Sequence, residues 1–176
     1  METLAKNYLH NCIKEFKKLK ELGDNTFMQI KDQDFFWSPD EESNSIAIIV
    51  RHLSGNMLSR WTDFLNSDGE KQNRNRDEEF DRLFYTDKDD VIYRWEKGWK
   101  CLFETLESLK EDDLIKEVFI RKEKHSVIEA INRQLTHYGY HLGQIVYLGK
   151  HLECANWKSL SIPRGKSKAF NEKLGM

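Results

Sequence analysis

The stretch Val127–Leu152, VIEAINRQLTHYGYHLGQIVYLGKHL, is the longest apolar-rich segment of the chain. Its apolar residues recur three and four positions apart, which predicts a helix with one buried face. His137 and His141 are four residues apart, so both imidazoles project from one side of this helix. His141 falls among the apolar residues and His137 at their border with the polar side. We therefore expect the pair to face inward, where it could bind one metal ion.

Three other segments have the apolar spacing of amphipathic helices. They are Leu4–Leu22, which Gly23 is placed to end, about Ser45 to about Asn66, and Asp90 to about Lys110. Either Asn44 or Ser45 is placed to cap the second of these. The polar connection from Ser67 to Lys88 is long enough to cross between parallel or non-neighbouring helices. The sequence thus predicts an all-α fold, a four-helix bundle with a long crossover connection between helices two and three.

Two regions fall outside the four predicted helices. Residues Val118–Lys124 fit either a short extended stretch or a turn, and residues from about 157 to 176 read as a C-terminal tail. The basic run Pro163–Lys168 in this tail is either solvated or an anion-binding segment. We expect residues 1–176 to form a single helical domain that includes this tail.

Composition excludes several functional classes. With 39% hydrophobic and 33% charged residues, and no apolar run near the roughly 20 residues of a membrane span, we expect a soluble cytoplasmic protein without membrane contact. The 28 basic and 30 acidic residues give a net charge of −2, which disfavours nucleic-acid binding. The three cysteines form no C-x-x-C pair, so neither a disulfide framework nor a thiolate zinc site is predicted.

A third histidine lies in the second predicted helix. His52 falls on the apolar side of that helix, beside Ile49 and Leu53. Three imidazoles suit Zn²⁺, Ni²⁺ or Fe²⁺ and leave coordination positions for water or substrate. Side-chain oxygens of three residues could accept a hydrogen bond from the second ring nitrogens, namely Asn56, Gln134 and Gln144. The plainer interpretation, that these histidines are only polar or structural residues, remains open at this stage.

The histidines, with their order and separation, are similar to the triad of the DinB/YfiT-like metalloenzyme superfamily. Further strings resemble one bacterial branch of that superfamily: HLSGNM (52–57), RWTDFL (60–65), SDGEK (67–71), HYGYHLGQI (137–145) and SLSIPRG (159–165). The resemblance covers almost the whole chain. It implies a DinB/YfiT-like bundle, a homodimer, and a divalent ion, zinc, nickel or iron, held in a cleft by His52, His137 and His141.

The resemblance also implies a chemistry. Members of this superfamily include enzymes that transfer or isomerise small thiol compounds, in which the metal activates the thiol as thiolate. We therefore expect a metal-dependent S-transferase, an enzyme whose small-molecule substrate is a low-molecular-weight thiol. The alternative is a non-catalytic, metal-bearing dimeric protein that binds a small ligand or serves in a stress response. No catalytic residue beyond the metal ligands is evident, and fold analogy alone does not decide between these functions.

We also make predictions for four other residues near the histidines. Gly139 and Gly143 share one face of the fourth helix, and a helical glycine costs about 1 kcal/mol, so we expect another helix to approach closely there. Arg51 and Arg60 flank His52, and each is a candidate either for recognising a carboxylate of a thiol cofactor or for an ordinary surface salt bridge.

Overall fold

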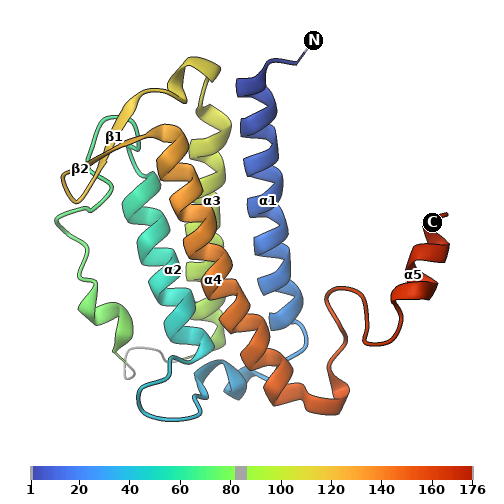
Figure 1. Ribbon diagram of the computed structural model, residues 1–176. Coiled ribbons are helices and arrows are strands. Elements are labelled where there is room, and N and C mark those ends of the chain that lie inside the picture. The colour runs from blue at the N-terminus through green and yellow to red at the C-terminus, as the bar shows by residue number, and fades with distance from the viewer. Residues whose placement is uncertain (1, 82–86, 176) are drawn as a thin grey trace.

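The computed structural model describes residues 2–81 and 87–175. Four long helices form a bundle (Figure 1), and they are α1 (Leu4–Phe27), α2 (Ile46–Trp61), α3 (Lys88–Ser108) and α4 (Val127–Glu153). The shorter elements are the 3₁₀ helices η1 (Asp32–Phe36), η2 (Asp77–Phe80), η3 (Glu111–Asp113) and η4 (Cys154–Asn156), the strands β1 (Glu117–Ile120) and β2 (Glu123–Ser126), and helix α5 (Ser167–Lys173). The fold is thus mostly helical, as predicted, with one small sheet.

Helices α2 and α3 lie side by side and run in the same direction. Near their middle the Ser54 hydroxyl donates to the Arg94 carbonyl, and near their ends the Thr105 hydroxyl donates to the Trp61 carbonyl. Parallel neighbours cannot be joined by a tight turn, so the chain between them must travel back along the bundle. The connection predicted at residues 67–88 makes this return, although its residues 82–86 lie outside the described part of the chain.

Side-chain caps set where the helices begin. Ser45, one of the two predicted caps, accepts from the backbone N–H of Ile48 and starts α2. Helix α2 ends at Trp61, five residues before the predicted end, because Thr62 is extended and Asp63 adopts a positive φ of 49°. The prediction of a helix to about Asn66 was therefore too long.

Three glycines, Gly23 of α1 and Gly139 and Gly143 of α4, do not have the roles that the sequence predicted. Gly23 does not end α1, which continues to Phe27. A Cβ at Gly23 would lie 2.5 Å from the Trp95 ring of α3. Glycine here permits close packing of two helices. At Gly139 and Gly143 a Cβ would meet nothing described within 4 Å, so no described helix of this chain makes the predicted close approach.

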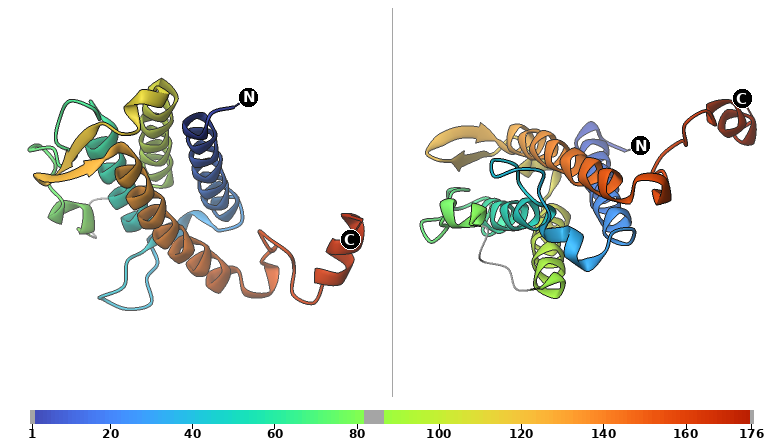
Figure 2. Two further views of the ribbon diagram at one scale, coloured as in Figure 1. Left: turned by 45° about the horizontal axis from the view of Figure 1, so that its top comes forward. Right: turned by 90° about the horizontal axis from the view of Figure 1, so that it is seen from below.

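The strands lie at one end of the bundle, and the tail lies at the other (Figure 2). Strands β1 and β2 pair antiparallel through a two-residue turn at Arg121 and Lys122, whose φ values of 56° and 64° are those of a tight hairpin. They account for the extended stretch predicted near Val118–Lys124. The predicted tail contains the short helix α5, whose residues are exposed.

Aromatic side chains fill the centre of the bundle. The largest of them, Trp61, Trp95, Trp99, Tyr138 and Phe16, are almost fully buried and come from all four long helices. Among the described residues, no helix combines the length and the apolar character that crossing a membrane requires.

Candidate metal centre

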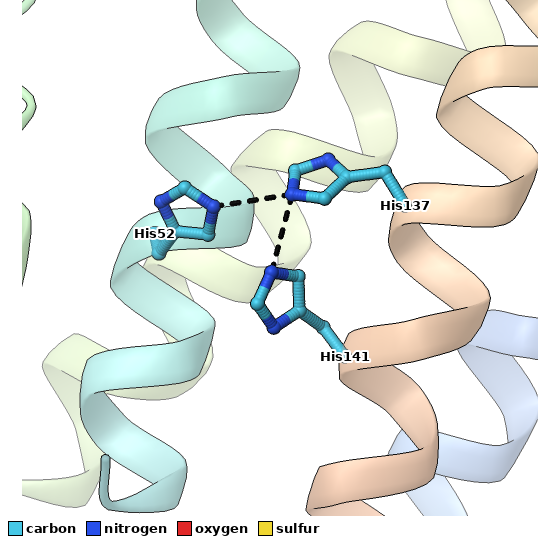
Figure 3. A group of neighbouring side chains, drawn as sticks. All are labelled: His52, His137 and His141. Carbon is cyan, nitrogen blue, oxygen red and sulfur yellow. Dashed lines mark hydrogen bonds between the residues drawn. The ribbon is translucent and has the colours of Figure 1, made fainter. Parts of the chain in front are cut away.

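The three predicted histidines meet between α2 and α4 (Figure 3). The Nε2 atom of His137 lies 3.2 Å from Nε2 of His52 and 3.1 Å from Nε2 of His141. One ring nitrogen from each residue falls within 4.8 Å of the others. Helix α4 supplies two of them one turn apart, and α2, running antiparallel to α4, supplies the third. The structure therefore brings together all three residues that the sequence singled out.

The two distances at His137 fit a shared divalent ion. Zinc–nitrogen bonds of about 2.0–2.1 Å in a tetrahedral site place neighbouring ligand atoms about 3.3–3.4 Å apart. The two Nε2 distances at His137 are close to this spacing. Burial, followed by the neighbouring His141 and His52, lowers the pKa of His137 to about 3, and burial also lowers the pKa of His141. Both rings are thus neutral near pH 7, as metal ligation requires.

Hydrogen bonds fix which ring nitrogens carry lone pairs. Nδ1 of His52 lies 2.9 Å from a carboxylate oxygen of Glu79, which can only accept, so this nitrogen donates, and in the neutral ring Nε2 then carries the lone pair. Nδ1 of His141 lies 2.9 Å from Oε1 of Gln144, and donation to this oxygen leaves Nε2 of His141 unprotonated too. His137 can offer one proton to at most one of these two lone pairs at a time. A cation between the three rings would accept a lone pair from each of the three Nε2 atoms.

Glu79 is a site residue that the sequence analysis missed. It lies in η2, is buried, and also accepts from Arg74 at 2.7 and 2.8 Å. Burial favours a higher pKa for the Glu79 carboxyl, but hydrogen bonds from His52 and Arg74 outweigh it, so the pKa is lowered overall. Gly55 of α2 makes room for it, because a Cβ there would overlap the carboxylate. The one sequence signal for a side chain packed here was Gly55, a glycine inside a buried helix.

The predicted hydrogen-bond partners of the histidines have three different outcomes. Gln144 lies at hydrogen-bonding distance from His141, as predicted. Asn56 instead accepts from the hydroxyl of Tyr138 at 3.0 Å. Gln134 is buried, and its Oε1 has no hydrogen-bond partner among the described residues.

The arginines that flank His52 are not surface residues. Both Arg51 and Arg60 are buried. Arg60 donates to Glu70 at 3.1 and 3.2 Å through its two terminal nitrogens, while Arg51 contacts the Asp81 carbonyl at 3.4 Å. An ordinary surface salt bridge is therefore the wrong description of either side chain.

The SDGEK segment ties the hairpin to the end of α2. The carboxylate of Asp68 accepts from the backbone N–H groups of Arg121 and Lys122 at 2.8 and 2.7 Å. The Gly69 N–H donates to the Phe119 carbonyl at 2.7 Å. Glu70, next along the chain, accepts from the Arg121 side chain at 3.1 Å. These bonds hold the hairpin, and Arg121 with it, beside the segment that follows the C-terminal end of α2.

Fold and site together define a helical-bundle protein with a three-histidine centre between two helices. The chain belongs to the family described as "Protein of unknown function (DUF1572)", which it matches over residues 3–166. No curated protein matches the chain, and no solved structure matches it.

Proposed function

We propose that this protein is a divalent-metal enzyme whose ion is held by His52, His137 and His141. The observation that carries the proposal is the convergence of three Nε2 atoms, with Nδ1 of His52 and of His141 at hydrogen-bonding distance from Glu79 and Gln144. When bound, such an ion supplies Lewis-acid chemistry that lowers the pKa of water or of a thiol. Three protein ligands leave positions for that molecule, which is the arrangement of catalytic rather than structural sites.

We further propose that the reaction is transfer of a low-molecular-weight thiol to an electrophile. The support is the resemblance of the histidine triad and its flanking strings to the DinB/YfiT-like superfamily, together with a bundle in which α2 and α4 present the triad. The same resemblance favours a homodimer, which light scattering coupled to gel filtration tests. In this scheme the chain positions the metal ligands through Glu79 and Gln144 and shields them from solvent by helix packing.

A turnover assay tests the proposal. Protein loaded separately with zinc, nickel or iron is mixed with a chloronitrobenzene and each of several small thiols, and product is followed by absorbance. We expect metal-dependent product formation that is lost in a His137→Ala/His141→Ala variant and kept in His10→Ala, an exposed histidine outside the cluster. Metal binding without turnover of any thiol would instead favour the non-catalytic ligand-binding alternative.

A further inference from the structure

A second feature of the site is a cavity of about 230 Å³ directly beside the histidines. Two of its wall residues are His52 and His137, so it opens onto the place where an ion would sit. Five arginines also line it, and we call it the arginine pocket: Arg60, Arg74, Arg76, Arg121 and Arg133. None of the described lining residues is acidic. The concentration of guanidinium groups beside the centre requires an explanation.

Ion pairs within the protein account for only part of this charge. Glu70 and Glu79 lie behind the wall and pair with Arg60, Arg74 and Arg121. By contrast, the nearest contact of Arg133 to a carboxylate is 3.6 Å, to the exposed Glu123, which His125 also approaches. The Arg76 guanidinium lies over the Phe80 ring at 5.1 Å and makes no ion pair within the described residues. Arg76 and Arg133 therefore leave positive charge available to a ligand.

Buried polar atoms in the same wall lack partners. Nε of Arg60 and Oε1 of Gln134 are both buried, and neither has a hydrogen-bond partner among the described residues. Both residues line the arginine pocket, and each side chain is almost fully removed from solvent. A buried polar group left unpaired costs about 1–3 kcal/mol, so native proteins rarely keep one without a ligand or water to satisfy it. These two atoms are independent evidence that the pocket accommodates a polar ligand.

We propose that the arginine pocket binds an anionic group of the substrate, a carboxylate or a phosphate, and holds the substrate next to the metal. This inference rests on the proposed function, because it assigns the substrate class for the same centre. Guanidinium groups match the geometry of both oxyanions and bind them through paired hydrogen bonds. The cavity is smaller than the roughly 300–1,000 Å³ of sites for drug-sized ligands, so it suits the charged end of a small molecule.

The test measures anion binding directly, without turnover. Isothermal titration calorimetry is performed with inorganic phosphate and, separately, with malonate, on the wild type, on Arg76→Gln/Arg133→Gln and on Lys14→Gln/Lys97→Gln. The first variant removes the two arginines with the fewest internal partners, and the second removes two exposed positive charges outside the pocket as the matched charge control. We expect saturable wild-type binding of at least one probe, weakened about tenfold or more in the arginine variant and unchanged in the lysine variant. Preference for one probe identifies the oxyanion.

Two outcomes overturn the inference: no saturable binding of either probe by the wild type, or equal binding by the wild type and the arginine variant. Each protein is titrated both metal-free and zinc-loaded, and its zinc content is measured by mass spectrometry. Zinc binding without arginine-dependent anion binding would overturn the proposal of an anion site and leave the proposed metal centre standing. Arginine-dependent anion binding by a protein that takes up no metal would overturn the proposed metal centre and leave the anion site standing. The two failures are therefore distinguishable.

Discussion

The two helices that hold the candidate metal ligands differ sharply in their surroundings. In α2, fourteen of sixteen residues are buried, whereas in α4 nine of twenty-seven are. His52 on α2 is oriented by a buried carboxylate that belongs to an arginine network, while His141 on α4 is oriented by an amide three residues further along its own helix. The same kind of ligand is thus positioned by tertiary packing in one case and by local helix geometry in the other.

The largest expected effect comes from removing the carboxylate on the α2 side. Glu79→Ala leaves the buried Arg74 without its closest partner, so the free energy of unfolding should fall by about 3 kcal/mol. Loss of the hydrogen bond to His52 should also weaken zinc binding about 10–100-fold. Urea unfolding of the metal-free protein and chelator competition measure the two effects separately.

The matched change on the α4 side is Gln144→Ala. Because Gln144 is only partly buried and its partner His141 lies on the same helix, unfolding should change by no more than about 0.5 kcal/mol. Zinc affinity should still fall, since His141 loses its orienting hydrogen bond. Equal losses of folding stability in Gln144→Ala and Glu79→Ala would contradict the contrast between the helices.

A loss of stability no larger than that of Glu79→Ala is expected when the space for Glu79 is filled. In Gly55→Ala the new methyl group overlaps the Glu79 carboxylate, and the resulting displacement should cost about 1–3 kcal/mol. This loss should outweigh the gain of about 1 kcal/mol that alanine brings to a helix. Thermal unfolding checks the sign: a raised Tm would mean that Glu79 does not need this space.

The last expected effect on folding stability has the opposite sign. In Gly139→Ala the methyl group of the open α4 face meets nothing within 4 Å, so the variant should be more stable by about 0.5–1 kcal/mol. We thus expect a glycine-to-alanine change to destabilise the protein at Gly55 of α2 and to stabilise it at Gly139 of α4. Urea unfolding at two protein concentrations measures it. A loss of stability that grows with protein concentration would show that a second copy packs on this face.

The same contrast explains how much the sequence could predict. The bundle and the three histidines follow from helical periodicity, which records which side of each helix is buried. Glu79 and Arg121 were missed because they lie in the connection after α2 and in the turn of the hairpin, where no helical period indicates which side chains are buried. Their positions depend on contacts between distant residues, such as the bonds from Asp68 to the Arg121 and Lys122 backbone. Gly23 was misread because its packing partner, Trp95, belongs to another helix.

The most direct test of the metal centre is the metal content of the untagged protein, purified without added metal and measured by mass spectrometry beside the His137→Ala/His141→Ala variant. The account predicts about one divalent ion per chain in the wild type and almost none in the variant. A wild-type protein that is empty and cannot be loaded with zinc, nickel or iron would contradict it.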